Sequence, residues 1–158
     1  MRLPEAEVQA FIRKNVRWLN EHIEKVKSSN RKLAALPCFT PDDIKAMSDA
    51  ALKIIPERVR YYANIIGVDY GRITIRCQKT KWGSCSSAGN LNFNCLLMAA
   101  PSEVLDSVVV HELCHRLYMD HSANFYREVY KAFPEYDKWN KWLKTNGQLL
   151  IRRMLAGK

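Results

Sequence analysis

The stretch Val110-His111-Glu112-Leu113-Cys114-His115 has the strongest consequences for the fold. It lies near the end of residues 102–118, where apolar side chains cover most of a predicted helix: Val104, Leu105, Val108, Val109, Val110, Leu113 and Leu117. Such a helix is expected to lie in the core. Burying two histidines and a glutamate in the core costs free energy unless these side chains have polar partners. The sequence therefore predicts a polar site built around this helix.

The spacing of the two histidines suits the binding of one metal ion. His111 and His115 lie about 40° apart around a helix axis and one turn apart along it, so both imidazoles can reach the same ion. Glu112 leaves the helix about 100° from His111, where it can reach a water on the metal without binding the metal. This is the H-E-x-x-H arrangement of zinc peptidases. The alternative is a pair of hydrogen-bonded core histidines.

A catalytic zinc usually has three protein ligands and a water, and His121 is the predicted third ligand. It follows His115 by six residues, so on one continuous helix it would point about 240° away. The helix is therefore expected to end near Tyr118 to Asp120. Asp120 tolerates turn conformations and Ser122 can cap the next helix. We predict one Zn²⁺ per chain.

Upstream of this segment, the pattern predicts a small sheet. Residues 72–77 and 90–95 alternate polar and apolar side chains, as half-buried strands do, and residues 79–89 are a Ser- and Gly-rich loop. Asn90, Asn92 and Asn94 fall on one face of the second strand.

Further helices are predicted in the sequence before the strands and after the histidine segment. Thr40-Pro41-Asp42-Asp43 has the features of a helix start, and Gly67 those of a helix end. Pro56 is expected to break or kink the helix between them. A helix over residues 4–28 precedes these elements, with His22 facing solvent. Helices from 122 to 133 and from Pro134 to a cap at Asn146-Gly147 follow, with an amphipathic tail at 148–158.

Composition places few restrictions on the function. A chain of 158 residues suits one domain, and no apolar run is long enough to cross a bilayer. The start of the chain lacks the apolar core of a signal peptide, so we expect a cytoplasmic protein. The net charge of +9 makes nucleic acid a possible partner.

The five cysteines are odd in number and form no C-x-x-C, so we expect free thiols. Cys114 is a rival metal ligand, but we expect it to pack in the core.

Several linked motifs resemble one family. Residues 111–115 with His121-Ser122 and Phe125, residues 79–86 (KTKWGSCS), residues 89–94 (GNLNFN) and Trp142-Leu143-Lys144 are similar to the YgjP-like metallopeptidase domain, a zincin relative of the SprT-like proteins. The resemblance covers about residues 50 to 147. In metzincins the same histidine spacing comes with a glycine in the turn, and Tyr118 in that place argues against a metzincin turn.

The resemblance implies an α+β fold: a minimal zincin with a small antiparallel or mixed sheet, an active-site helix and additional N- and C-terminal helices. We therefore expect a single domain, with a helical extension at 1–49, a hydrolase core at 50–147 and a tail at 148–158. In zincins an edge strand pairs with the extended substrate. The strand with Asn90, Asn92 and Asn94 is the predicted edge strand, and the alternative is a strand with one solvated polar face. Trp82 and Gly83 are further candidates for substrate binding, and the alternative for them is packing within the fold.

Three functions remain open from the sequence. The first is a metallopeptidase in which Glu112 is the general base and Tyr118, Tyr126 or Arg127 stabilises the oxyanion. The second is a zinc-dependent hydrolase of a small phosphorylated molecule such as a nucleoside triphosphate, with phosphate contacts from the cations Arg72, Arg76, Lys79 and Lys81. The third is a non-catalytic nucleic-acid-binding module with structural zinc, although such a zinc site normally has four protein ligands.

Overall fold

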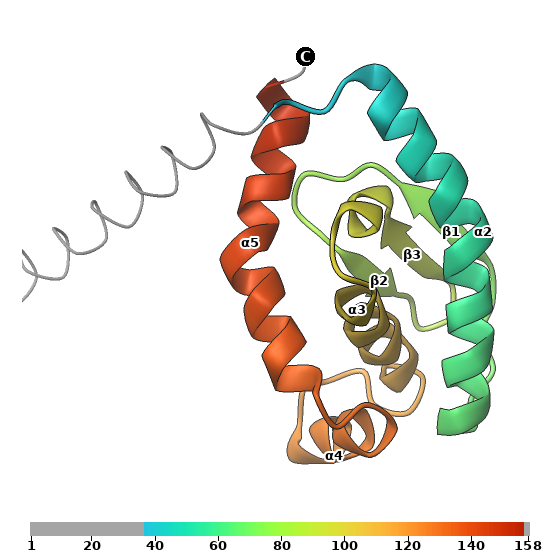
Figure 1. Ribbon diagram of the computed structural model, residues 1–158. Helices are drawn as coiled ribbons and strands as arrows, with labels where there is room; N and C mark the ends of the chain where they lie inside the picture. Colours follow the sequence, from blue (N-terminus) through green and yellow to red (C-terminus); the bar gives the residue numbers. More distant parts are fainter. Residues whose placement is uncertain (1–36, 157–158) are drawn as a thin grey trace, which may run out of the picture. The chain divides into compact units, whose positions relative to one another are not determined.

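The structure is a computed structural model that describes residues 37–156, of which residues 38–156 belong to one compact unit of the chain. The predicted helix over residues 4–28, with His22, lies outside the described residues. Four helices, a 3₁₀ turn and a three-stranded sheet follow in the order α2-β1-β2-β3-η1-α3-α4-α5 (Figure 1). In the described part of the chain, no helix has the length and apolar character that a membrane span needs.

Helix α2 (Pro41–Ile66) begins and ends where the sequence predicts. Thr40 and Asp43 form a reciprocal capping box, and Gly67 adopts the left-handed conformation, with φ of 77°, just after the last turn. The prediction of a break at Pro56 is wrong, because the helix runs through it. Proline removes one backbone hydrogen bond, but the buried residues on both sides, Ile55 and Val59, hold the helix to the core.

The sheet has the order β1-β3-β2, with β1 (Ile73–Arg76), β2 (Gly83–Cys85) and β3 (Leu91–Asn94). Strand β1 is parallel to β3, and β2 is antiparallel to it. Two strands are thus confirmed, but β2 lies inside the predicted loop 79–89. Because β3 is the central strand, the prediction that it is the substrate-pairing edge strand is wrong, and β2 is the edge strand beside the histidine helix.

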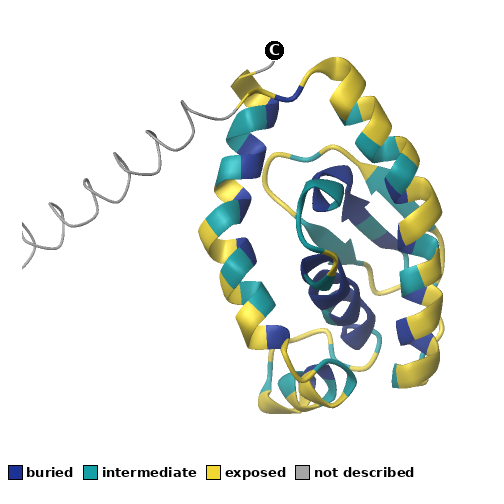
Figure 2. Cartoon of the chain, viewed as in Figure 1, coloured by how far each residue is buried: buried dark blue, intermediate teal, exposed yellow. Residues whose placement is uncertain are grey.

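Helix α3 (Ser102–Cys114) follows the 3₁₀ turn η1 (Cys95–Ala99) and is buried along almost its whole length (Figure 2). It packs against α2, α4, α5 and β2. The predicted core helix is therefore confirmed, but it ends at Cys114 and not at 118. The buried groups on it include Asp106, whose carboxylate pairs with Arg58 of α2 through a hydrogen bond of 2.7 Å from Nε to Oδ1.

Two further helices complete the described fold. Ser122 caps α4 (Ala123–Ala132), as predicted. Helix α5 spans Tyr136–Ala156, so the prediction of a cap at Asn146-Gly147 is wrong. The residues beyond 147 are helical because three of them form a second apolar cluster with Phe39 and Leu96: Leu150, Ile151 and Met154. The expected segment boundaries at 49 and 147 both fall within continuous helices.

Gly147 lies inside a helix because its missing side chain makes room for Trp82. A Cβ at this position would stand 2.9 Å from the Trp82 ring, closer than real Cβ atoms approach another group. The indole of the loop before β2 therefore packs directly on the backbone of α5. This contact fixes the separation between β2 and α5 at one end of the sheet.

Gly147→Ala is expected to lower the urea midpoint of unfolding. Alanine is the better helix former by about 1 kcal/mol, but its Cβ would force the rigid indole of Trp82 to move. Thr145→Ala, an exposed change on the same helix, should leave the midpoint unchanged or raise it. Adding Trp82→Leu to Gly147→Ala should recover part of the loss. A higher midpoint for Gly147→Ala alone would contradict the close contact.

Candidate metal centre

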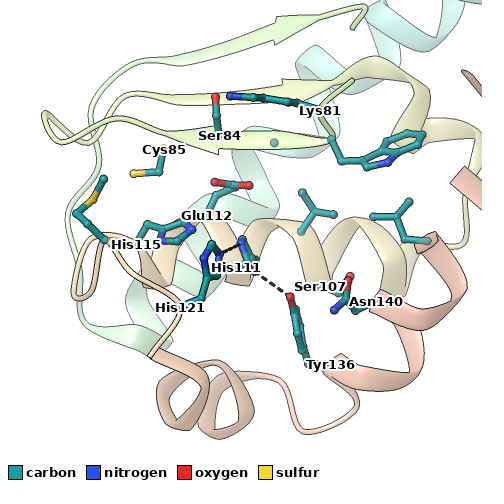
Figure 3. A pocket seen from close by; sticks show the side chains of 15 residues that line it. Lys81, Ser84, Cys85, Ser107, His111, Glu112, His115, His121, Tyr136 and Asn140 are labelled. Carbon is teal, nitrogen blue, oxygen red and sulfur yellow. Dashed lines mark hydrogen bonds between the residues drawn. The ribbon is translucent and has the colours of Figure 1, made fainter. Parts of the chain in front are cut away.

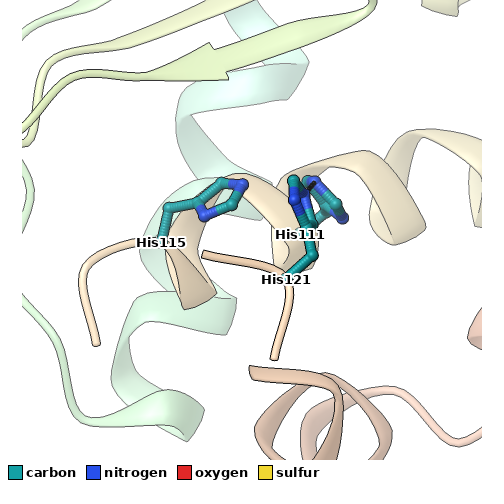
Figure 4. A group of neighbouring side chains, drawn as sticks. All are labelled: His111, His115 and His121. Atoms are coloured by element: carbon teal, nitrogen blue, oxygen red, sulfur yellow. Dashed lines mark hydrogen bonds between the residues drawn. The ribbon is translucent and has the colours of Figure 1, made fainter. Parts of the chain in front are cut away.

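Three histidines from two segments of the chain converge in the structure (Figure 4). His111 lies in the last turn of α3, His115 directly follows α3, and His121 follows the turn before α4. Their ring centroids are 4.8 to 5.0 Å apart, and one nitrogen from each lies within 4.8 Å of the other two. The predicted triad is therefore assembled.

The chain reverses just after Cys114, which brings His121 back to the helix. The N–H groups of Leu117 and Tyr118 donate to the Cys114 carbonyl and close the turn. The Asp120 carboxylate then accepts from the Ser122 N–H at 3.2 Å. The reversal was predicted from the position of His121, although it begins earlier than the predicted Tyr118 to Asp120.

Phe125 supports all three imidazoles from the same side. It is fully buried on α4, and its ring centroid lies 5.0, 4.7 and 5.0 Å from the centroids of His111, His115 and His121. An aromatic ring in contact with three others limits their rotation.

Two hydrogen bonds decide which ring nitrogens are available to a metal. His115 Nδ1 lies 3.0 Å from the Tyr118 carbonyl oxygen, which can only accept, so this nitrogen carries the hydrogen and Nε2 keeps its lone pair. His111 Nδ1 lies 2.8 Å from the Tyr136 hydroxyl oxygen. The Nε2 atoms of His111 and His121 face each other at 3.1 Å. The nitrogens that remain free therefore point toward a common centre.

This donor set fits a zinc ion. Tetrahedral Zn²⁺ holds imidazole nitrogens at about 2.0–2.1 Å, which places two ligands about 3.3 Å apart. The separation of the His111 and His121 Nε2 atoms is close to that value. Neutral imidazole is the required ligand form, and burial lowers the pKa of His111 to about 4, so this ring is neutral at pH 7.

Glu112 lies beside the triad and under strand β2 (Figure 3). Its side chain is buried, and this burial raises its pKa to about 7, although the charge of Lys81 and a hydrogen bond from the Cys85 backbone act in the opposite direction. A Cβ on Gly83 would stand 2.6 Å from the Glu112 carboxylate oxygen Oε1. Only glycine allows the strand to pass this close to the carboxylate.

The triad and Glu112 open into a cleft of about 450 Å³, lined also by Trp82, Gly83 and Tyr136. The two predicted substrate contacts in the loop and β2, Trp82 and Gly83, therefore lie where a substrate would meet them. Among the residues 90–94, none lines the cleft. The side-chain amide of Asn94 donates to the carbonyls of Gln78 and Lys81, and its oxygen accepts from the Leu96 N–H.

The remaining asparagines are also used within the fold. The Asn90 side-chain oxygen accepts from the Arg72 N–H at 3.0 Å, and the Asn92 amide lies 3.3 Å from the Ser84 hydroxyl. The prediction that Asn90, Asn92 and Asn94 bind substrate therefore disagrees with the geometry. Their regular spacing reflects one polar face of a central strand.

The predicted oxyanion donors are also not in the cleft. Tyr118 packs on the core, Tyr126 contacts His121 from outside, and Arg127 is exposed near Glu128. Tyr136 at the start of α5 does line the cleft, and burial raises the pKa of its hydroxyl, which stays protonated at neutral pH. No local motif pointed to Tyr136, which lies 25 residues after its partner His111.

All five cysteines lie in the described part of the chain, and no disulfide joins any two of them. Cys114 is fully buried and is not part of the metal-ligand group. Burial raises the pKa of its thiol to about 12, which disfavours the thiolate that would bind zinc.

The fold and the site define a class of protein, a small α+β protein in which three histidines that could hold a metal ion converge at the end of a buried helix. Two crystal structures share the fold, those of the metallopeptidase zymogens abylysin from Pyrococcus abyssi and jannalysin from Methanocaldococcus jannaschii. Their TM-scores are 0.55 and 0.53 at 24% and 23% sequence identity, and each match covers 60% of this chain and 96% or 97% of the other. Among curated proteins the chain has no match.

The family follows from the sequence match. Residues 42–146 match the YgjP-like, metallopeptidase domain family, and the chain belongs to this family. The resemblance inferred from the motifs is confirmed, and so is the minimal metallopeptidase fold.

Tyr136→Phe is expected to weaken the binding of zinc about 10- to 100-fold, because it removes the hydroxyl that orients His111. Competition with a fluorescent chelator measures this affinity. Tyr130→Phe removes an exposed hydroxyl that bonds Asp137 and serves as the control, with an unchanged affinity. An unchanged affinity in Tyr136→Phe would show that this hydroxyl does not hold the ring.

Proposed function

We propose that the protein is a zinc-dependent peptidase, with His111, His115 and His121 as the metal ligands and Glu112 as the general base. The observation that carries the proposal is the convergence of three imidazoles beside a buried carboxylate in one open cleft. Family membership supports the same chemistry.

His111, His115 and His121 would hold the zinc ion, which would supply a Lewis acid able to polarise the scissile carbonyl and to lower the pKa of a water. Glu112 accepts a proton from the attacking water and passes it to the nitrogen of the leaving amine as the C–N bond breaks. Its burial between β2 and α3 suits this task, because a carboxylate with a raised pKa is a stronger base and a ready acid in turn.

Tyr136 is the residue we assign to the oxyanion. When His111 binds metal through Nε2, its Nδ1–H donates to the Tyr136 oxygen at 2.8 Å. The hydrogen of the tyrosine hydroxyl is then free to point into the cleft that this residue lines. A fixed donor at that place stabilises negative charge as it develops on the carbonyl oxygen.

The cleft gives less support to the alternative substrates. Of the four cations considered for phosphate binding, only Lys81 lines the cleft, whereas Arg72, Arg76 and Lys79 do not. Edge strand β2 beside the metal site is instead a surface to which an extended peptide can add. The structural-zinc alternative lacks a fourth protein ligand among the described residues.

Glu112→Gln is expected to reduce peptide hydrolysis by about 10²- to 10⁴-fold while zinc content and fold remain. Glutamine has nearly the same shape but accepts no proton at neutral pH. Activity on casein and on quenched-fluorescent peptides is measured next to nucleoside triphosphates, with zinc measured by elemental analysis. Retained activity would show that another group is the base. Loss of zinc together with activity would show that Glu112 binds the metal or positions its ligands.

Protein purified without added metal is expected to contain about one zinc per chain. His121→Ala should lower this occupancy and weaken the affinity, since two ligands remain where a catalytic site uses three. Cys114→Ser is the control and should keep the metal. Full occupancy with wild-type affinity in His121→Ala would mean that the third ligand is misassigned.

A further inference from the structure

The cleft extends well beyond the metal site in one direction. Figure 3 shows Cys85 and His115 on one side of His111, and Ser107 and Asn140 on the other. On the side of Ser107, the wall consists of α3, α5 and the indole before β2. A second cavity of about 390 Å³ continues there along α5, and Trp82, Asn140 and Leu143 line both cavities.

The part of the cleft nearest the metal on this side is an apolar subsite, formed by Trp82, Val108 and Leu143. Val108 and Leu143 are 7% and 9% exposed, so they belong to the core and leave only one surface open to a ligand. The Ser107 hydroxyl donates to the Val104 carbonyl and adds no free donor. A bulky apolar side chain is the complement of such a wall.

The continuation of the cleft past Trp82 is a basic subsite, with Lys144 and Gln148 at its end. Lys144 is exposed and forms no ion pair within the described residues. Lys81 lines the first cavity, where its charge acts on Glu112, and its side chain extends away from Trp82 towards Ser84 (Figure 3). Glu112 is the only carboxylate that lines either cavity among the described residues. The cleft thus presents positive charge on both sides of its apolar subsite.

The Asn140 side chain lies between the two subsites. It lines both cavities and has no hydrogen-bond partner among the described residues. An amide in this position can bond a peptide backbone that runs along the cleft, opposite the free edge of β2.

We propose that the cleft selects protein segments in which a bulky apolar residue is flanked by acidic residues. The apolar side chain enters the subsite of Trp82, Val108 and Leu143, and the flanking carboxylates pair with Lys144 and Lys81. This inference rests on the proposed peptidase function and adds to it the class of substrate. The net charge of +9 favours the same partners at long range.

The test uses zinc-loaded Glu112→Gln protein, in which peptides bind without turnover. Two labelled peptides share an Ala/Ser background and one central Leu, flanked on each side by two Glu or by two Lys. Fluorescence anisotropy measures their dissociation constants. The acidic peptide is expected to bind about two- to twentyfold more tightly, since each exposed ion pair contributes a factor of about 1.4 to 5. Replacing the Leu by Ala should weaken the binding of both peptides.

A pair of charge reversals on α5 separates a local contact from overall charge. Lys144→Glu is expected to remove or invert the preference for the acidic peptide. Lys141→Glu changes the net charge equally on an exposed residue that lines neither cavity, and it should keep most of the preference. Equal effects of the two substitutions would overturn the proposal, as would a wild-type site without charge preference or without binding of either peptide.

Turnover of the same peptides by the wild-type protein keeps the two proposals apart. Binding that depends on Lys144 without any hydrolysis would leave the substrate class in place and count against the peptidase function. Hydrolysis of the acidic and basic peptides at equal rates would support the peptidase function and reject the substrate class.

Discussion

Helix α3 carries polar groups through the middle of an apolar core, and each group needs a partner there because an unpaired buried polar group is costly. On the helix, Asp106 has Arg58 as its partner, while His115, directly after the helix, has the Tyr118 carbonyl, and His111, again on the helix, has Tyr136. These partners come from α2, from the turn after α3, and from α5. The requirement to satisfy α3 therefore determines which elements must surround it, and the metal ligands are oriented by the same bonds that make the helix compatible with the core.

The second constraint is the close approach of backbone to side chain at two glycines. Gly83 brings β2 against the Glu112 carboxylate, and Gly147 brings α5 against the Trp82 indole. Trp82 directly precedes Gly83, so one short segment sets both distances. The position of Glu112 relative to the cleft wall thus depends on two contacts that only glycine permits.

Much of the site was predictable because it depends on residues that are close together in the sequence. The two histidines four residues apart, the capping residues Thr40 and Ser122, and the turn required by His121 all depend on neighbours in sequence. Strand β2 was missed because its three residues, Gly-Ser-Cys, have no alternating pattern and are held by pairing with β3. From sequence alone, Gly147 looks like the end of a helix. Its place inside α5 is explained only by the Trp82 indole, which packs on it and lies 65 positions earlier in the chain. Tyr136 was missed for the same reason, as its partner His111 is distant in sequence.

One face of helix α5 nevertheless contacts both the histidine triad and the cleft. Tyr136, Asn140, Leu143 and Gly147 follow each other at steps of four, three and four, so they lie on one face of the helix. The first residue of this stripe bonds a metal ligand, the next two line the cleft, and the last receives Trp82. The same face continues into Leu150, Ile151 and Met154, which anchor the helix in the second apolar cluster. A shift of α5 along its axis would therefore move the orientation of His111 and the width of the apolar subsite together. Packing at the far end of α5 is thus coupled to the orientation of His111 and to the width of the proposed apolar subsite.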